Sequence, residues 1–542
     1  MASIEQGKGA SKSFVRQSSG LIREFGVGDV ILINIVGVNI GIVLAVSIAS
    51  LAGLWPGASM ILVVILGAIV SLATVGVYGM LSATMPRAGG DYVFIGRGLS
   101  PWLGFTANWM MTFSLFVLFG LFSVGTITQA IAPALAAYGL LANDDSIVSF
   151  ATKISTDKTI LAFCAVGLML AAAAVALAGD RIVKWAFRIL AAVGIGGVLI
   201  LIVVLLTTDN ATFVNNMNEA LSRYQGGTIE GMRAAADKGG FSPVSFSIAA
   251  SFSALPFAFY SFVGLTYTSY LGGEIQRPQR SQPIGMLIAL GVSLLLFILL
   301  FIGVYQTLGW DNIHAWASLA GSDPAAIKFF NGSALGSFIL GVTTGSPFLA
   351  AIMVLMFAAW FFMILLWALM MPIRNLFAWS MDGILPQAVT KVSRRGTPWV
   401  ATIIVGVIGV AMAIVAVYST FISLVVNYTL LYSTTFLLAG ICAVVFPYRR
   451  RELFEKAPAF VQTKIGGIPL LTIAGVVESL TFLVIIYEAL KTPAFGGPTG
   501  NAALYLIGGL LLAGPVVFFV SRWIRIRQGY DVDAAFRTLP PE

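Results

Sequence analysis

Long, unbroken runs of apolar residues recur along the whole chain and dominate its pattern of hydrophobic and polar positions. A helix needs about 20 apolar residues to cross the roughly 30 Å hydrocarbon layer of a bilayer, and twelve runs approach or exceed that length. They lie at residues 27–50, 57–82, 102–132, 159–178, 186–207, 244–271, 284–309, 347–372, 398–419, 422–446, 468–490 and 502–526. Because the runs are continuous and do not alternate apolar with polar positions, they exclude a β-barrel. The pattern predicts an all-α integral membrane protein with twelve transmembrane helices.

The polar segments between the runs carry lysine and arginine unevenly. If the N-terminus lies in the cytoplasm, the inward segments hold 24 of the 31 Lys and Arg residues and the outward loops hold seven. Basic residues concentrate in cytoplasmic loops, so the pattern predicts that both termini are cytoplasmic. The flanking and connecting parts are then a cytoplasmic tail over 1–26, an extracellular loop over 208–243 and a second cytoplasmic tail over 527–542.

The composition strengthens the assignment to a membrane protein and removes other classes. Hydrophobic residues make up 58% of the 542 positions and charged residues 10%, whereas soluble domains carry about 25% charged residues. Cys164, Cys442 and the single histidine, His314, offer neither a disulfide framework nor a metal-ligand cluster. The net charge of +8 is largely the inward excess of Lys and Arg. We therefore expect the lipid bilayer as surroundings, no nucleic-acid partner, no metal and no cofactor.

Two of the runs contain helix breakers near their middle. The first has Gly37 and Gly41 on either side of Asn39, and the sixth continues from Pro256 to Gly264 through a stretch rich in aromatic and hydroxyl side chains. Glycines four positions apart also let two ordinary helices pack closely. In lipid, however, an interrupted helix persists only where it lines a buried cavity. Breaks at corresponding positions of two repeats indicate the binding site of a transporter.

Runs one and six occupy corresponding places in two groups of five. The groups cover residues 27–207 and 244–446, and runs eleven and twelve, with their connecting loop, cover 447–526. Because five is odd, the second group enters the membrane with the opposite orientation to the first. The sequence thus predicts a five-plus-five inverted repeat with two peripheral helices.

An interrupted helix supplies binding groups without any charged side chain. One half-helix presents free backbone N–H groups at a positive dipole end, and the other presents carbonyl oxygens. An amino acid zwitterion needs both kinds of group. No residue near the two breaks is acidic, which favours a neutral amino acid over a polyamine or a cationic amino acid.

Four segments at topologically matching points resemble motifs of one transporter family. Residues 85–92 read Met-Pro-Arg-Ala-Gly-Gly-Asp-Tyr after the second run, and 274–278 read Glu-Ile-Gln-Arg-Pro after the sixth. Arg374 precedes Asp-Gly-Ile-Leu-Pro over 382–386 after the eighth run, and Pro447 with Arg449 and Arg450 ends the tenth. Together these segments resemble the amino acid–polyamine–organocation (APC) superfamily of permeases, and the resemblance covers most of the chain.

The resemblance implies a LeuT-type inverted-repeat fold, and secondary transport of amino acids or related amines by alternating access. It places the substrate between broken helices one and six. The matching residues in helix one are Gly37, Val38, Asn39 and Gly41. In helix six they are Tyr260, Ser261, Phe262 and Gly264, to which the residue pattern adds the neighbouring Phe259. Tyr260 matches a position that closes over the substrate in some members.

Departures from the family pattern bear on the coupling ion. The eighth run has no Ser or Thr between Phe348 and Trp379, where sodium-coupled relatives use a hydroxyl pair. Gly194 stands near where some proton-coupled members have a lysine, and Thr266 stands where some antiporters have a glutamate. Exchange or uniport without an ion stays open, and a proton is favoured weakly over sodium.

A few polar residues lie inside the runs. Glu478 is an ionisable residue at mid-run, so it is a candidate for proton coupling. The alternative is a protonated carboxyl that hydrogen-bonds across helices or across a dimer contact. We expect Asn34, Asn108 and Asn427 to form hydrogen bonds between helices. Asp29 is close enough to a run end to be solvated there.

These observations predict a permease for amino acids, neutral ones in particular, in the cytoplasmic membrane. A transporter of another small solute, such as an organic amine or a nucleobase, keeps the same fold. An intramembrane enzyme would need a catalytic pair at bilayer depth, and the runs offer a single mid-run carboxylate and no histidine. We therefore predict that the protein is not an enzyme.

Overall fold

The computed structural model describes residues 21, 23–419, 428–492, 501–529, 532 and 536. Asn427 and most of the basic N-terminal tail lie outside these residues. The described chain is helical apart from one short antiparallel hairpin, β1 (Lys464–Ile465) with β2 (Ile468–Pro469). The prediction of an all-helical protein is confirmed for this part of the chain.

The helices up to residue 274 are α1 (Val27–Val38), α2 (Ile40–Leu54), α3 (Met60–Thr84), α4 (Asp91–Gly98), α5 (Pro101–Gly125), the π-helix η1 (Thr126–Ile131), α6 (Ala132–Ala142), α7 (Asp145–Thr156), α8 (Lys158–Leu177), α9 (Asp180–Thr207), α10 (Asn210–Tyr224), α11 (Ile229–Lys238), α12 (Ile248–Ser253), α13 (Leu255–Tyr260), and the 3-10 helices η2 (Val263–Tyr270) and η3 (Gly272–Glu274). The later ones are α14 (Pro278–Leu308), α15 (Trp310–Ser322), η4 (Pro324–Ala326), η5 (Phe330–Gly332), α16 (Gly336–Thr343), α17 (Pro347–Met381), η6 (Gln387–Thr390), α18 (Trp399–Tyr418), α20 (Tyr428–Arg449), α21 (Arg451–Glu455), α22 (Leu470–Lys491) and α23 (Asn501–Arg527).

Eleven helical spans among the described residues are long and apolar enough to cross a membrane. They correspond to eleven of the twelve predicted runs. The sixth run, 244–271, does not form one long helix, because it is divided into α12, α13 and η2. Its division follows from Pro256, which lies in the first turn of the new short helix α13, and from the switch to a 3-10 helix at Val263.

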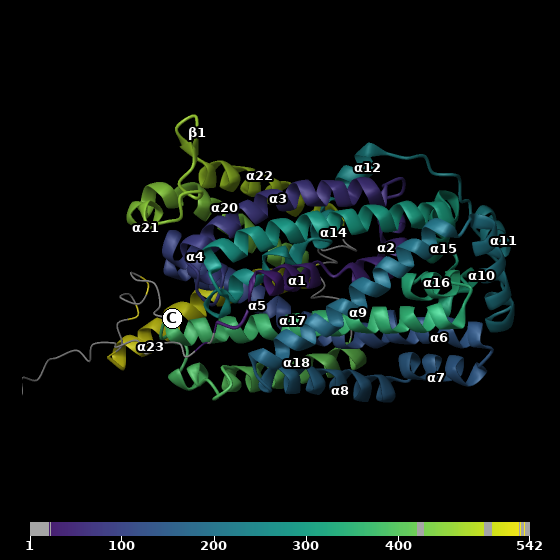
Figure 1. Ribbon diagram of the computed structural model, residues 1–542, viewed down its shortest axis with the longest axis horizontal. Coiled ribbons are helices and arrows are strands. Elements are labelled where there is room, and N and C mark those ends of the chain that lie inside the picture. The colour runs from purple at the N-terminus through teal and green to yellow at the C-terminus, as the bar shows by residue number, and fades with distance from the viewer. Residues whose placement is uncertain are drawn as a thin grey trace, which may run out of the picture.

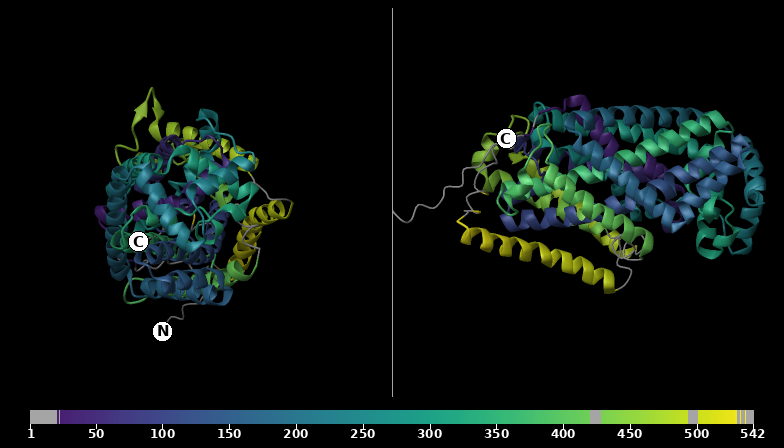
Figure 2. Two further views of the ribbon diagram at one scale, coloured as in Figure 1. Left: turned by 90° about the vertical axis from the view of Figure 1, so that its right-hand side faces the viewer. Right: turned by 90° about the horizontal axis from the view of Figure 1, so that it is seen from below.

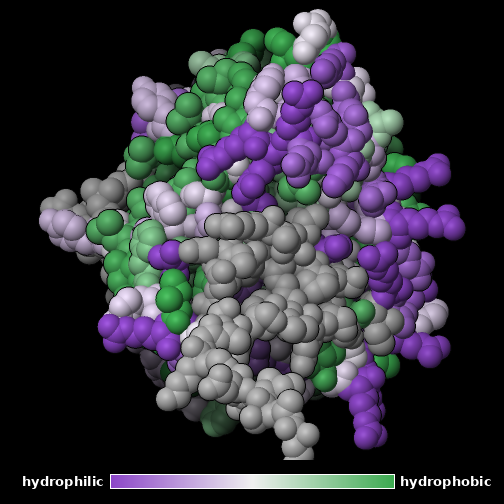
Figure 3. All heavy atoms as spheres, turned by 90° about the vertical axis from the view of Figure 1, so that its left-hand side faces the viewer, coloured by the Kyte–Doolittle hydropathy of each residue, from purple (hydrophilic) through white to green (hydrophobic). Residues whose placement is uncertain are grey.

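The long helices lie side by side along the long axis of the molecule (Figure 1). The connecting elements gather at its two ends, with α4, α21 and β1 at one end and α7, α10, α11 and α16 at the other (Figure 1). We call these the α4 end and the α10 end. The predicted inward segments supply the first group and the predicted outward loops supply the second. Hydrophilic side chains gather on the α4 end (Figure 3).

Burial divides the long helices into a central and a peripheral set. Most positions of α1, α2 and α17 are buried, whereas α8, α18 and α23 bury few, and α23 runs along the outside of the bundle (Figure 2). The side chains of Phe163, Leu295 and Leu512 are 76%, 58% and 69% exposed. Lipid chains solvate such residues as readily as a protein core does. The central set is the part that holds the site described next.

Candidate functional site

The first predicted span is interrupted at a single residue, Asn39. This residue adopts a left-handed conformation with φ +48°, which separates α1 from α2. Its side-chain oxygen accepts a hydrogen bond of 2.8 Å from the N–H of Ile42, so it caps α2. Asparagine tolerates this backbone region and caps helices well. The break therefore follows from the residue type at position 39.

The sixth predicted span is interrupted after Tyr260, where α13 ends. The hydroxyl of Ser261 donates a hydrogen bond of 3.0 Å to the carbonyl oxygen of Phe257, one turn earlier. Phe262 leaves the helical region at φ −125°, and the chain continues as η2. Ser261 thus closes the end of the short helix with its side chain.

The two interrupted segments contact each other through glycine backbones. A Cβ atom built on Gly37 would lie 2.9 Å from the carbonyl carbon of Gly264 and 3.0 Å from its Cα. No other residue type fits such an approach without displacement. One turn earlier, the side-chain oxygen of Asn34 accepts a hydrogen bond of 3.3 Å from the N–H of Thr268. The predicted interhelical role of Asn34 is confirmed.

Trp360 of α17 joins the helix-one break to α9. Its carbonyl oxygen accepts a hydrogen bond of 2.9 Å from the side-chain amide of Asn39. Its indole N–H donates to the carbonyl oxygen of Gly194 at 3.1 Å. A Cβ on Gly41 would lie 2.8 Å from Cδ1 of the same indole. The space beside Gly194 is therefore occupied by Trp360.

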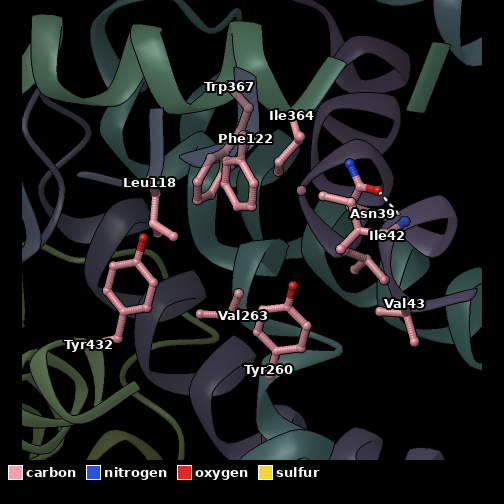
Figure 4. Close-up of a pocket in the computed structure, with 12 residues that line it drawn as sticks. Asn39, Ile42, Val43, Leu118, Phe122, Tyr260, Val263, Ile364, Trp367 and Tyr432 are labelled. Atoms are coloured by element: carbon pink, nitrogen blue, oxygen red, sulfur yellow. Dashed lines mark hydrogen bonds between the residues drawn. The ribbon is translucent and has the colours of Figure 1, made fainter. Parts of the chain in front are cut away.

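A cavity lies beside the two breaks (Figure 4). It is lined by Gly37, Val38, Asn39, Ile42, Val43, Leu118, Phe122, Tyr260, Val263, Ile364, Trp367 and Tyr432. None of these side chains is charged. The rings of Phe122, Tyr260 and Tyr432 surround a common space, with the Tyr260 hydroxyl directed toward it (Figure 4). Small-molecule sites are typically mostly apolar with a few placed polar groups, and this cavity has that composition.

Four of the nine residues expected at the substrate line this cavity, namely Gly37, Val38, Asn39 and Tyr260. The other five lie close by without lining it. Gly41 packs on Trp360 and Gly264 on Gly37. Phe262 packs against Phe297, with ring centroids 5.6 Å apart.

The two remaining residues of that set, Phe259 and Ser261, serve helix six itself. Phe259 meets Phe482 of α22 edge to face at 4.8 Å between centroids, and Ser261 caps α13. Sequence reasoning missed Trp367 and Tyr432, which lie in apolar runs eight and ten. No local pattern distinguishes an aromatic residue that faces a cavity from one that faces lipid.

A polar cluster around Asp91 lies next to η2, toward the α4 end. Asp91 is fully buried in the first turn of α4. It accepts hydrogen bonds from the amide of Asn108 at 2.8 Å, from the hydroxyl of Tyr78 at 3.4 Å and from the hydroxyl of Tyr270. Asn108 in turn accepts a hydrogen bond of 2.8 Å from the indole of Trp379. The predicted interhelical role of Asn108 is confirmed.

Burial raises the pKa of Asp91 to about 6, while the hydrogen bonds from Tyr270, Asn108 and Tyr78 act to lower it. Desolvation is the larger effect because it disfavours the charged carboxylate. The carboxyl can therefore change protonation state close to physiological pH.

Buried ion pairs tie the segments at the α4 end together. Arg374 of α17 binds Glu274 through two hydrogen bonds of 2.9 Å and contacts Asp180 at 3.1 Å. Arg97 of α4 pairs with Asp382 at 2.6 Å. The side chains in these pairs are at most 2% exposed. The motif residues Glu274, Arg374 and Asp382 thus form buried ion pairs that connect separate segments of the fold.

Two ionisable residues of the spans differ in their surroundings. Asp29, expected to be solvated near a span end, is instead buried and pairs with Arg188 at 2.7 Å. This expectation was wrong because α9 brings a cation to it. Glu478 is fully buried and faces Thr74 of α3. Its carboxyl oxygens have no hydrogen bond of acceptable geometry among the described residues. Burial inside the subunit disfavours a dimer contact for Glu478.

A family model described as amino acid permease matches residues 27–513. The match includes both helix breaks, the cavity-lining residues, the Asp91 cluster and the buried ion pairs.

Proposed function

The chain belongs to the amino acid permease family, and on this premise we propose that it moves neutral amino acids across the cytoplasmic membrane by alternating access around the two helix breaks. Members of this family are multi-pass membrane transporters, not enzymes. The cavity between the breaks is the observation that carries the proposal, since none of its lining residues is charged. A dedicated carrier of cationic or anionic amino acids would need a side chain of opposite charge there.

The proposed substrate contacts use backbone groups of the breaks. The N-terminal turn of α2 directs its positive dipole end toward the break, which suits a carboxylate. The carbonyl oxygens at the end of α1 and at the helix-six break suit an ammonium group. The side chain then packs among Phe122, Tyr260 and Trp367, which favours an apolar or aromatic amino acid.

We further propose that residues 27–207 and 244–446 are two inverted five-helix repeats, with 447–526 peripheral and both termini cytoplasmic. Breaks at corresponding places, Asn39 in the first repeat and Phe262 in the second, support this arrangement. The excess of Lys and Arg in segments expected at the α4 end supports its cytoplasmic orientation. The interrupted helices then lie where the repeats meet, as in other inverted-repeat transporters.

Reconstitution into proteoliposomes tests the proposal. We expect saturable uptake of a labelled neutral amino acid in counterflow, competed by apolar and aromatic amino acids more strongly than by acidic or basic ones. If only organic amines or nucleobases compete, the proposed substrate class is wrong, whereas the assignment of the fold is unaffected. Counterflow without any response to proton or sodium gradients would indicate an exchanger.

A matched pair of variants tests the cavity. Leu118→Trp fills space at the cavity lining and is expected to lower uptake strongly. Leu295→Trp places the same change on a side chain that is 58% exposed toward lipid and is expected to leave uptake near the wild-type rate. Equal uptake by both variants, with both folded, would contradict the assignment of the cavity.

A further inference from the structure

Asp91 is placed where three parts of the fold meet. It begins α4 and binds Tyr78 of α3, Asn108 of α5 and Tyr270 of η2 through its two carboxyl oxygens. A backbone hydrogen bond joins the same segments: the N–H of Gly89, just before α4, donates to the carbonyl oxygen of Tyr270 at 3.2 Å. The carboxylate is therefore the acceptor that holds the segment after the helix-six break against α3, α4 and α5.

In the described part of the chain, the titratable and charged groups around Asp91 are phenols or have partners elsewhere. The titratable groups on its carboxyl are the phenols of Tyr78 and Tyr270. On α4 itself, Arg97 is paired with Asp382. From α20, the thiol of Cys442 donates to the carbonyl oxygen of Phe94. Among the described residues no lysine or arginine forms an ion pair with Asp91.

Two further residues interact with the tyrosines that bind Asp91 and not with Asp91 itself. Glu478 of α22 interacts electrostatically with Tyr78, the same phenol that binds Asp91. Tyr432 of α20 lies close enough to Tyr270 to interact with it electrostatically. As far as the described residues show, the Asp91 site thus holds one carboxylate, several phenols and no compensating cation.

The Asp91 cluster connects to the cavity along η2. This segment begins at Val263, which lines the cavity, and ends at Tyr270, which binds the carboxylate. Tyr432 also lines the cavity. A change in how Asp91 holds Tyr270 therefore acts on the same short segment that closes one side of the substrate space.

We propose that Asp91 is the proton-binding site through which this transporter couples substrate movement to a proton. The proposal rests on the proposed transport function. A proton binds a carboxylate oxygen of Asp91 and converts an acceptor into a donor. Tyr78 and Tyr270 then lose a charged acceptor, but protonation also removes the larger cost of a buried charge. Binding of the proton therefore favours the closed α4 end, and opening of that end is linked to release of the proton.

Release of the proton follows from hydration of the same group. With the α4 end closed, burial holds the pKa of Asp91 at about 6. When η2 moves away, water reaches the carboxyl, and its pKa falls toward the ordinary value of about 4. The proton leaves to the cytoplasm, and the carboxylate can bind Tyr270 again. One proton enters and one leaves in each cycle.

The test uses the full-length protein in proteoliposomes with a pH-sensitive dye inside. Substrate-driven proton uptake per substrate moved is measured for wild type, Asp91→Asn and Glu478→Gln, and the pH dependence of uptake is measured for the tyrosine variants. Asp91→Asn is expected to reduce proton uptake per substrate to background. Proton coupling retained in Asp91→Asn, or lost in Glu478→Gln alone, would overturn the proposal.

Tyr270→Phe keeps the proposal testable if Asp91→Asn does not fold. Loss of the Tyr270 hydroxyl removes a hydrogen bond that favours the carboxylate, so the midpoint of the pH profile should rise by about one unit. Tyr267→Phe is the matched control, because this hydroxyl of η2 has no hydrogen-bond partner among the described residues. Its midpoint should stay at the wild-type value. Equal midpoints in all three proteins would contradict the role of Asp91.

The two proposals fail in distinguishable ways. If wild-type protein shows no amino acid counterflow, the proposed transport function fails. If wild-type counterflow is present but substrate moves no protons, only the role of Asp91 fails.

Discussion

The backbones of Gly37 and Gly264 touch where the helix-one and helix-six segments cross, beside the cavity. A side chain on Gly37 would begin 2.9 Å from the carbonyl carbon of Gly264. The two segments belong to different predicted repeats. Their contact fixes the separation of the two breaks and hence the width of the cavity between them.

Gly264→Ala is expected to destabilise the protein and to lower uptake, because its Cβ would overlap the backbone of Gly37. Overpacking of this kind costs about 1–3 kcal/mol. Thermal unfolding in detergent and proteoliposome uptake measure the two effects. Gly291→Ala is the matched control, since a Cβ there meets nothing within 4 Å. Equal unfolding temperatures of the two variants would argue against a close contact.

Asn39→Ala and Asn39→Gly separate the backbone role of Asn39 from its side-chain role. Both variants lose the cap on Ile42 and the hydrogen bond to Trp360, together worth about 1–2 kcal/mol. Only alanine also strains the left-handed conformation, by about 1 kcal/mol. The free energy of unfolding is therefore expected to fall further for alanine. A glycine variant that is less stable than the alanine variant would refute this division.

Arg374→Gln is expected to lower stability by about 3–5 kcal/mol, because it leaves Glu274 and Asp180 buried without their cation. Arg451→Gln supplies a control on the surface, where the arginine is 80% exposed and paired with Glu455. Exposed pairs contribute little to stability. Thermal unfolding of both variants measures the contrast, and similar shifts would show that burial of the Arg374 pairs is unimportant.

The pH dependence of stability is expected to carry a contribution from Asp91. Its folded-state pKa is raised from 3.8 to about 6. A raised pKa means that the folded state binds the proton more tightly than the unfolded state. The stabilisation is full below pH 4 and is lost as the pH rises toward 6, by about 3 kcal/mol in total.

Asp91→Asn removes this pH-dependent contribution. The unfolding temperature of the variant, relative to wild type, is therefore expected to be higher at pH 7 than at pH 4. A difference between the two proteins that does not change with pH would contradict the raised pKa.

Hydropathy and breaker residues predicted much of the architecture. Apolar runs long enough to span lipid leave few alternatives to helices, and eleven of them form candidate spans within the described ranges. The breaks at Asn39 and after Tyr260 were also predictable, because asparagine between glycines and a proline followed by hydroxyls weaken a helix locally. The 3-10 form of η2 was not, since it depends on the contacts that Tyr270 and Thr268 make with distant elements.

The side chains of the site were less predictable than its backbone. Tyr260 follows from its position at a break, but Trp367 and Tyr432 reach the cavity only through the rotation of α17 and α20 within the bundle. Arg374 appears in the sequence as one more inward basic residue, yet it is buried between Glu274 and Asp180. Helix packing decides which charged side chains are buried, and the spacing of residues along the chain does not reveal that packing.

The uncharged lining of the cavity has an electrical consequence. Moving one elementary charge across a membrane potential of 100 mV changes the free energy by about 2.3 kcal/mol. A zwitterion held by an uncharged cavity carries no net charge, so voltage acts on neither the substrate nor its lining. If Asp91 takes up a proton, that proton alone makes transport electrogenic. The transport current is then proportional to the number of transport cycles that carry a proton.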